Sequence, residues 1–483
     1  MIHYKAIAKV MGGLLMLLGI LMLPGIAFSF YYKSGDQVPL IYSAFVSVAM
    51  GALLFFSFSK QDQNIRKREG YLIVALSWIF MSIFGMMPYL VSGTLPQISD
   101  ALFETVSGLT TTGASVLNDI EALPKGILFW RSMTQWIGGL GIIVLTVAIF
   151  PLLGIGGIEL FVAESPGPTS DKLHPRIRET AKRLWYVYVG LTALCALLYY
   201  LGGMNVYDAI NHSLTTLATG GFSTKNASMA YFDVPFIQYV AILFMFIAGT
   251  NFTVVYFALM GKFDKVWKSD EFKAYVLVVA LIIIGLAIPV YFLSGNVLEK
   301  AFRDTAFQVV SLVTTTGFVS ADYTSYGHGV TILFFLLLFV GGCAGSTAGG
   351  IKFIRHLTFF KNTILEFKRI VHPRAVVPLK INSERVTGKI ITHIMIFLLI
   401  YLMVFVVGSV VMSIVGYDML TSFGAVATCL GNVGPAIGRV GPLDNFSFLD
   451  PFTKIFLCLI MLLGRLELFT ILVVFTPYFW RAN

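Results

Sequence analysis

The chain has 483 residues, of which 57% are apolar and only 12% are charged, and its formal net charge is +9. Soluble globular proteins carry about 25% charged residues, so a chain with so few charges and a mean hydropathy of +0.82 does not have the surface of a soluble enzyme or binding domain. The composition predicts an all-α membrane protein that crosses the lipid bilayer many times.

Apolar segments of about 20 residues, long enough to cross about 30 Å of hydrocarbon, recur along the whole chain. The first follows Lys5 and Lys9, as in a secretory signal, but it is longer than the apolar core of such a signal and other spans follow it. We therefore interpret it as a transmembrane helix rather than a cleaved leader. The clearest segments are Val10–Tyr32, Leu40–Phe58, Tyr71–Val91, Val240–Leu259, Tyr275–Leu293, Ile390–Val415 and Ile455–Phe475.

Basic residues gather in alternate loops between these segments, which is the pattern of membrane topology. The loops rich in lysine and arginine lie around Arg66, around Arg178, around Lys265 and over the stretch from Lys352 to Lys389. We predict that these loops are cytoplasmic. The intervening loops are poor in lysine and arginine and are predicted to be external. A nucleic-acid surface would not require this alternation, so we expect no nucleic-acid partner.

Four internal repeats lie in the external segments, each a short amphiphilic stretch that ends in a Thr/Gly-rich turn. They align without a gap, and their final glycines are separated by 108, 96 and 117 residues, which is room for two spans and one re-entrant segment. Each begins at a residue suited to cap a helix, namely Asp100, Asp208, Asp304 or Thr421. About ten helical residues would then cover only about 15 Å, half the hydrocarbon thickness. The segments are Asp100–Ala114, Asp208–Phe222, Asp304–Phe318 and Thr421–Pro435.

This pattern predicts four M1–P–M2 pore-loop repeats in pseudo-fourfold arrangement, preceded by two transmembrane helices. The two leading helices occupy residues 1–68, and the repeats occupy 69–165, 180–262, 270–370 and 386–483, the third with a Gly-rich intramembrane run. Non-helical backbone at membrane depth is tolerated only where it is buried in protein or lines a watery cavity. The four turns would meet that condition by converging on one axis.

At such an axis the half-helices would direct the negative ends of their dipoles toward the centre, which favours a cation. The extended turns would present rings of carbonyl oxygens that replace the hydration shell of a potassium-sized ion, and the final glycine permits the positive φ needed to turn a carbonyl inward. One Thr-Thr-Thr-Gly alone is a common loop end, so the prediction depends on the fourfold recurrence. The predicted filter residues are Thr110, Thr111, Thr112 and Gly113; Ala218, Thr219, Gly220 and Gly221; Thr314, Thr315, Thr316 and Gly317; and Gly431, Asn432, Val433 and Gly434.

The repeats, the two leading helices and several local motifs resemble the Trk/Ktr/HKT superfamily of potassium transporters, and within it the bacterial TrkH-type subunits. The motifs that carry the resemblance are TTTG at Thr110–Gly113, TTTGF at Thr314–Phe318, GGCAGSTAGG at Gly341–Gly350 and GRLELFT at Gly464–Thr470. The resemblance implies potassium uptake across the bacterial inner membrane, with potassium as substrate, no resident cofactor and no enzymatic reaction. In plant relatives, loss of the first-repeat glycine accompanies sodium transport, so glycine in all four repeats favours potassium.

The Gly-rich run Gly341–Gly350 interrupts the expected second span of the third repeat. Close packing of helices is one explanation, and a phosphate cradle is excluded because no GK[ST] follows. Since each glycine costs a helix about 1 kcal/mol relative to alanine, a flexible loop is favoured, and the resemblance makes it an intramembrane gate below the filter. The predicted gate residues are Gly341, Gly342, Gly345, Ser346, Thr347, Gly349, Gly350, Lys352, Arg465 and Glu467.

Arg465 is a charged residue in the middle of the last predicted span. Such a charge is a functional site by default, and the resemblance puts it in the pore just inside the filter, where it would repel cations. A structural ion pair with another helix is the alternative. Glu467 lies two positions away and would face another side of the helix, so it is a poor partner for Arg465. It is a candidate to hold the Gly-rich run closed through a hydrogen bond.

A few other polar residues lie at membrane depth. Glu104 and Gln308 occupy the same position in the first and third repeats, where each is expected to bond the adjacent return strand. His212 and Asn251 are interpreted as satisfied core groups. A second short set, predicted to be interfacial anchors at the start of a span, is Arg131, Gln135 and Trp136.

Two other functional classes are weighed against ion conduction. A cation-coupled secondary transporter has broken helices at the midplane, but it usually shows two inverted repeats, whereas this chain has four in one orientation. An intramembrane enzyme would need a nucleophile or metal motif, and the sequence has no HExxH or GxSxG. The basic stretch Lys361–Lys389 could dock a soluble partner, and the resemblance implies a nucleotide-binding TrkA-type regulatory subunit and a homodimer.

Overall fold

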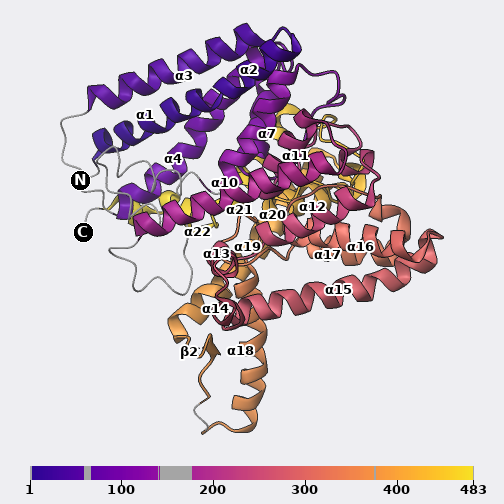
Figure 1. The fold of residues 1–483 in the computed structure, drawn as a ribbon. Helices are drawn as coiled ribbons and strands as arrows, with labels where there is room; N and C mark the ends of the chain where they lie inside the picture. Colours follow the sequence, from indigo (N-terminus) through magenta and orange to yellow (C-terminus); the bar gives the residue numbers. More distant parts are fainter. Residues whose placement is uncertain (1–2, 59–66, 140, 142–176, 375–376, 482–483) are drawn as a thin grey trace.

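The structure, a computed structural model, describes residues 3–58, 67–139, 141, 177–374 and 377–481 (Figure 1). The predicted all-α fold is confirmed: within these ranges regular structure is helical except for one antiparallel hairpin of two-residue strands. Six of the described helices are long and apolar enough to cross a bilayer, and two bent helix pairs would bring the number to eight. The hairpin consists of β1 (Lys380–Ile381) and β2 (Glu384–Arg385).

The two predicted leading helices form an antiparallel pair at one edge of the molecule (Figure 1). A Cβ built on Gly12 would lie 2.6 Å from the carbonyl oxygen of Gly51, and one on Gly51 would lie 2.7 Å from that of Gly12. The two backbones are therefore in direct contact, as small residues allow between membrane helices. The first span is α1 (Tyr4–Leu21) with α2 (Leu23–Tyr32), and the second is α3 (Gln37–Ser57).

Four repeats follow, each with an outer helix, a short pore helix and a second helix, so the M1–P–M2 organisation is confirmed. Repeat 1 contains α4 (Lys67–Gly85), α5 (Met87–Val91), α6 (Ile98–Leu109) and α7 (Lys125–Gly139). Repeat 2 contains α10 (Ile177–Leu201), α11 (Val206–Leu217), α12 (Pro235–Ala248) and α13 (Phe252–Leu259). Repeat 3 contains α15 (Asp270–Ser294), α16 (Leu298–Val313), α17 (His328–Leu337) and α18 (Phe353–Val371). Repeat 4 contains α19 (Gly388–Val415), α20 (Met419–Gly431), α21 (Pro451–Arg465) and α22 (Phe469–Leu472).

Short elements join these helices or end the chain. Two are α-helical, and the others are single 3-10 turns in the loops that follow pore helices or near the C-terminus. They are η1 (Ser228–Tyr231), α14 (Phe263–Trp267), η2 (Tyr323–Tyr326), η3 (Gly438–Val440), η4 (Val473–Phe475) and α23 (Pro477–Trp480).

The predicted continuous spans Val240–Leu259 and Ile455–Phe475 are wrong, because both second helices are broken. The axes of α12 and α13 differ by 113°, and those of α21 and the segment Phe469–Phe475 differ by 108°. Asn251 begins α13 by accepting a hydrogen bond from the Thr253 amide at 2.8 Å, which competes with continuation of the preceding helix. In the other break Glu467 and Leu468 have positive φ.

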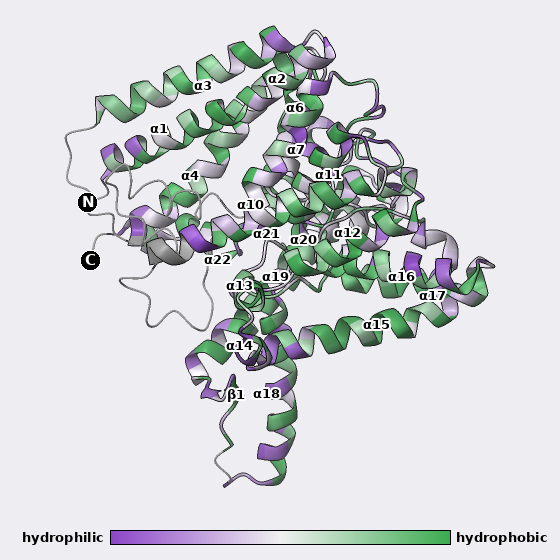
Figure 2. Cartoon of the chain, viewed as in Figure 1, coloured by the Kyte–Doolittle hydropathy of each residue, from purple (hydrophilic) through white to green (hydrophobic). Residues whose placement is uncertain are grey.

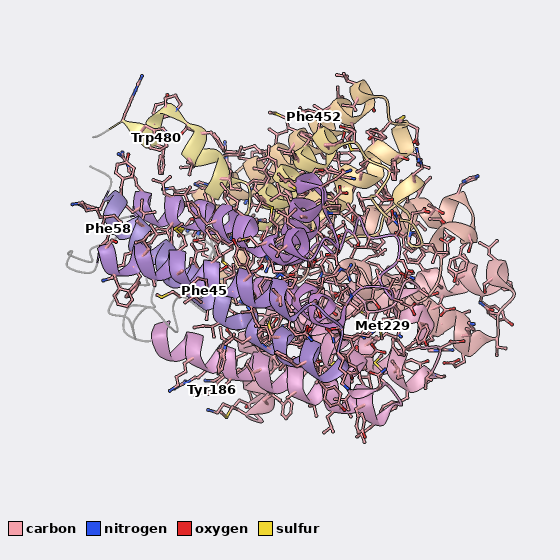
Figure 3. All side chains as sticks on the ribbon, turned by 90° about the horizontal axis from the view of Figure 1, so that it is seen from above. Phe45, Phe58, Tyr186, Met229, Phe452 and Trp480 are labelled. Carbon is pink, nitrogen blue, oxygen red and sulfur yellow. The ribbon has the colours of Figure 1, made fainter. Side chains whose placement is uncertain are left out.

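Hydropathy follows the architecture (Figure 2): the long helices are largely apolar, and polar residues gather at helix ends, in loops and on α18. Side chains fill the space between the helices (Figure 3), and large apolar residues also cover the outside. Phe45, Tyr186 and Phe452 are 57% to 69% exposed, whereas Met229 is fully buried. An exterior this rich in apolar side chains belongs in lipid, so the chain is a multi-pass membrane protein.

Helix α18 projects away from the other helices at the end of α15 (Figure 1). It is amphipathic, and its apolar face includes Phe360, Ile364, Phe367 and Ile370, which are 62% to 73% exposed. Asp270 at the start of α15 fixes its base: the carboxylate accepts from Lys361 at 3.2 Å and from the Asn382 amide at 3.1 Å. The hairpin and α18 are thus joined to the end of α15.

Candidate functional site

The four Thr/Gly-rich turns form a closed ring in the order of the repeats. A Cβ built on Gly113 would meet the Gly220 carbonyl oxygen, and one built on Gly221 would meet the Thr316 oxygen. In the same way Gly317 faces the Val433 oxygen, and Gly434 lies beside the Thr112 oxygen at 2.7 Å. Each repeat therefore abuts the next and the fourth closes on the first. The turns surround one axis, and no other residue type fits at the four glycines without moving a carbonyl.

The backbone of the turn is the same in all four repeats. Two residues before each glycine, Thr111, Thr219, Thr315 and Asn432 have φ between 51° and 55°. The four glycines have φ between 74° and 104°, which confirms the predicted positive φ. A β-branched residue in this left-handed region is strained, and such strain persists only where the surroundings fix it. Three threonines at one register position therefore show that each turn is held by its helix.

The pore helices hold the turns through one repeated hydrogen bond. The amide following the left-handed residue returns to a carbonyl in the last helical turn: Thr112 to Ser107 at 2.9 Å, Gly220 to Thr215 at 2.9 Å, Thr316 to Ser311 at 2.8 Å and Val433 to Thr428 at 3.0 Å. This bond is the mark of a Schellman end. It ends α6, α11, α16 and α20 at the ring, where their negative dipole ends favour a cation.

A polar side chain in each of the first three pore helices ties the return strand to its helix. Glu104 accepts from the Val116 amide at 3.0 Å, and Gln308 donates to the Ala321 carbonyl at 3.0 Å, as predicted. His212 takes the same position in repeat 2; its Nε2 lies 2.9 Å from Ser223 Oγ and its Nδ1 lies 2.8 Å from the Asp208 carbonyl oxygen. The prediction that His212 is a satisfied buried group is confirmed. Repeat 4 has Ala425 there.

The predicted capping residues are wrong in all four repeats, because the pore helices begin earlier. The N-caps are Gln97, Asn205, Val297 and Asp418, and only Asn205 and Asp418 accept a backbone hydrogen bond. Asp208 falls in the first turn, where a carboxylate also interacts favourably with free amides. There it accepts from Asn205 Nδ2 at 2.8 Å.

The Gly-rich run interrupts repeat 3 between α17 and α18, as predicted, and residues 341–352 have no helix. Thr347 and Gly349 of the run make its contacts with the ring and the adjoining helix ends. Thr347 Oγ1 donates to the Leu217 carbonyl at 3.0 Å and to the Ala248 carbonyl at 3.1 Å, and the Gly349 amide donates to Thr315 Oγ1 at 2.6 Å. The run therefore contacts repeats 2 and 3.

The other part of the run is fixed at the peptide of Ala344. Its amide donates to Glu271 Oε1 at 2.7 Å, and its carbonyl accepts from Asn251 Nδ2 at 2.6 Å. Asn251 is thus satisfied, as predicted, but it is half-buried and bonds the run instead of lying in the core. The backbone bonds from Gly341 to Ile351 and from Phe353 to Gly342, both 2.9 Å, close the base.

Arg465 is the last residue of α21 and not a mid-helix residue, because the helix breaks directly after it. A cation at a helix C-terminus is favourable. Its guanidinium donates to the Thr347 carbonyl at 2.9 Å, to the Gly139 carbonyl at 3.1 Å and to the Gly138 carbonyl. The arginine thus connects repeat 4 to the Gly-rich run and to the end of α7.

Glu467 does not bond the Gly-rich run in the described residues. Its carboxylate pairs with Arg355 in α18 at 2.5 Å, and that guanidinium lies 3.8 Å from the centre of the Phe397 ring. The break after Arg465 turns Glu467 toward α18, which residue spacing on a continuous helix could not reveal. Lys352 instead contacts the run, through a hydrogen bond from Nζ to the Ala348 carbonyl.

Arg131 and Gln135 are not interfacial anchors, because both side chains of α7 are buried in the protein. Arg131 pairs with Glu104 at 2.6 Å and donates to the Ser223 carbonyl at 2.8 Å. Gln135 donates to the Gly220 carbonyl at 2.5 Å. Trp136 is half-buried and donates to Thr192 at 3.2 Å. The i, i+4 spacing of two long polar side chains on one apolar helix was the available signal for a shared buried partner.

Among the residues that the structure describes, no three His, Cys, Asp or Glu side chains gather as a metal site. The oxygens at the ring are backbone carbonyls, threonine hydroxyls and the Asn432 side-chain oxygen, which is buried without a hydrogen-bond donor in the described part of the chain. Such hard, uncharged oxygen ligands suit an alkali cation that passes through.

Comparisons with known proteins agree with this arrangement. The family model described as TrkH, cation transport protein, matches residues 39–481. The chain is 41% identical over 487 residues to the Trk system potassium uptake protein TrkH of Escherichia coli K12, covering 99% of this chain and 100% of the relative. It is 35% identical to the Trk system potassium uptake protein TrkG of the same strain, covering 99% of both. The crystal structure of the potassium transporter TrkH from Vibrio parahaemolyticus superposes with a TM-score of 0.89 at 38% identity, covering 99% of this chain and 100% of that one.

Proposed function

The chain belongs to the TrkH family of cation transport proteins, a family of transporters and not of enzymes, and we propose that it takes up potassium ions through a filter formed by its four Thr/Gly-rich turns. The observation that carries the proposal is the closed ring, in which each glycine faces a carbonyl oxygen of the next repeat. Rings of carbonyls can replace the water around potassium. The names of the relatives support the same ion.

The proposed filter residues are those of the four Thr/Gly-rich turns, with backbone oxygens as ligands. All of them are buried or half-buried, and their conformations repeat at the same register positions. A ring whose backbone is fixed by four helix ends can keep its oxygens at one spacing, which favours one ion size. This rigidity supports a selective filter rather than a wide aqueous pore.

We propose that the Gly-rich run, with Arg465, is the gate. The run contacts the ring from below through Thr347 and Gly349, and Arg465 holds the Thr347 carbonyl. A polypeptide segment and a fixed positive charge under the ring would both oppose passage of a cation. Lys352 adds a second positive charge beside the run. The pair Glu467–Arg355 connects the break after α21 to α18, so movement of α18 would reach the gate.

The experiment that tests the function is ion flux into liposomes that contain the purified protein. We expect potassium and rubidium to enter, and sodium and lithium to be excluded by at least about tenfold, which corresponds to about 1.4 kcal/mol. Equal entry of all four ions would contradict a carbonyl filter. A parallel measurement with a pH gradient distinguishes channel-like flux from proton symport.

A cation-coupled transporter of another small solute is the second candidate, because broken helices are common in that class. The breaks after α12 and α21 favour it. However, they flank a ring to which four repeats contribute equally, and this supports ion passage along the axis. Solute uptake without potassium flux would favour the second candidate.

We propose a homodimer and a TrkA-type nucleotide-binding partner on the cytoplasmic side. The exposed apolar face of α18 supports contact with a second copy, since it projects away from the rest of the molecule (Figure 1). Crosslinking of cysteines placed on α18 in native membranes would give dimers; a helix that faces lipid would give none. Co-purification with the regulatory subunit, with and without nucleotide, tests the other contact.

A further inference from the structure

Repeat 2 lacks the side chains that brace the turn in repeats 1 and 3. In those repeats two threonines bond each other across the turn: Thr110 Oγ1 lies 2.7 Å from Thr112 Oγ1, and Thr314 Oγ1 lies 2.8 Å from Thr316 Oγ1. The corresponding residues of repeat 2 are Ala218 and Gly220, and neither carries a hydroxyl. Repeat 4 lacks the pair as well, at Gly431 and Val433, and there the left-handed Asn432 donates through Nδ2 to the Met461 carbonyl at 3.0 Å. The left-handed residue of repeat 2 is a threonine, so its turn needs a different support.

The side chain of Gln135 in α7 fills the missing place. A Cβ built on Gly220 would lie 2.5 Å from Gln135 Oε1 and 2.8 Å from Nε2. The carboxamide therefore occupies the space that a threonine takes in the other turns. Because Gln135 is fully buried, no water competes for its hydrogen bonds.

Both ends of the carboxamide bond the turn, on either side of Gly221. Nε2 donates to the Gly220 carbonyl at 2.5 Å, and Oε1 accepts from the Phe222 amide at 3.0 Å. One helical turn earlier, Arg131 donates to the Ser223 carbonyl and stacks on Phe222 at 3.6 Å. Repeat 1 thus holds the turn of repeat 2 at successive peptides.

This support is specific to repeat 2. Gly139 faces Ala218 and Gly249 faces Thr314, in each case the first residue after the next pore helix, so the two glycines are equivalent. Gln135 and Met245 each lie four residues before these glycines and therefore correspond. Gly138 and Gly464 likewise approach Leu109 and Leu430, which makes Met461 the counterpart in repeat 4. Of the four equivalent carbonyls at residues 112, 220, 316 and 433, only that of Gly220 accepts from a side chain in the described part of the chain.

We propose that Gln135 is a positioning residue of the filter: its carboxamide replaces the threonine pair missing from repeat 2, fixes the Gly220 and Gly221 peptides, and thereby sustains discrimination between potassium and sodium. The inference rests on the proposed filter function. It assigns to a residue of repeat 1 the geometry of the turn in repeat 2. Gln135 fixes the Gly220 carbonyl, which is one of the four carbonyls in a filter layer. Loss of Gln135 should therefore change ion selectivity as well as stability.

The test is Gln135→Met, which introduces the residue found at the corresponding position of repeats 2 and 4. Flux of potassium and sodium is measured in liposomes, normalised to the amount of monodisperse protein. We expect potassium flux to remain and the potassium-to-sodium ratio to fall about tenfold, the effect of losing two buried hydrogen bonds. A role in folding alone would lower both fluxes together and leave the ratio unchanged.

Two further variants make the result specific. Thr134→Val is the matched control, since the Thr134 hydroxyl bonds only the Arg131 carbonyl of its own helix, and the ratio should not change. Adding Ala218→Thr and Gly220→Thr to Gln135→Met restores the threonine pair, and Gly220 has no positive φ to forbid a side chain. We expect this triple variant to recover the ratio.

The outcomes separate the two proposals. An unselective unsubstituted protein would overturn the filter itself. A selective unsubstituted protein with an equally selective Gln135→Met variant would overturn only the role of Gln135. The potassium-to-sodium ratio could fall in Gln135→Met and stay low in the triple variant. That result would show that the carboxamide does not replace the threonine pair.

Discussion

The ring of four turns and the Gly-rich run that contacts it are both non-helical, glycine-rich backbone, yet they are held in different ways. In all four repeats the ring has a left-handed residue, a glycine of positive φ and a return hydrogen bond at the same register positions. The run belongs to repeat 3 alone and is held by separate side-chain bonds from Thr347, Asn251, Glu271 and Arg465. Repetition fixes the ring as one unit, whereas the run, our proposed gate, is held by contacts that occur once each.

The largest effect is expected from Gly221→Ser, because it breaks the repeated geometry of the ring. A Cβ there would meet the Thr316 carbonyl oxygen at a φ of 74°. The strain of about 1–3 kcal/mol and displacement of a ligand carbonyl should lower potassium flux by about a hundredfold. Gly93→Ser is the control, since Gly93 has a φ of 72° and open space around it. Equal losses in both would show that φ alone, and not the ring, matters.

Shortening the run should have the next largest effect, in the opposite direction. Deleting Gly345, Ser346 and Thr347 removes the bonds of Thr347 to the ends of α11 and α12 and the acceptor of Arg465. We expect flux to rise about thirtyfold, with the potassium-to-sodium ratio unchanged because the ring is intact. Unchanged flux would argue against a gate. A lower ratio would mean that the run also shapes the filter.

Arg465→Ala should raise flux less, by about tenfold. A tenfold change corresponds to about 1.4 kcal/mol, which is the expected result of losing the positive charge together with the bond to the Thr347 carbonyl. Arg465→Lys keeps the charge but cannot bond all three carbonyls. Its flux should lie between those of the unsubstituted protein and Arg465→Ala. A variant that only aggregates, with no change in flux per folded molecule, would support a structural role.

These outcomes also show what the sequence could and could not predict. The turns were predictable because four copies of a local pattern occur in one chain, and the polar position of Glu104 and Gln308 followed from aligning the copies. The helix starts were wrong because Asp100, Asp208 and Thr421 suit the first turn of a helix as well as its cap, and Asp304 lies further inside α16. The contact of Asn251 with the Gly-rich run and the roles of Arg131 and Gln135 depend on partners about 90 residues away, which local spacing does not contain.

The smallest effect is expected at Glu271, which holds only the far part of the run. Glu271→Ala removes the acceptor of the Ala344 amide and should raise flux about threefold, the effect of one net hydrogen bond. Glu271→Gln keeps an oxygen in the same place and should behave like the unsubstituted protein. If the glutamine variant conducts as much as the alanine variant, the charge and not the bond is what restrains the run.

The closed ring has a genetic consequence, because its four quarters are encoded separately in one reading frame. In an assembly of four identical subunits any filter mutation appears four times at once. Here a codon change alters a single quarter, so repeat 2 can carry alanine and glycine at positions where repeats 1 and 3 carry threonines. Covalent linkage of the quarters lets selectivity evolve in small, independent steps.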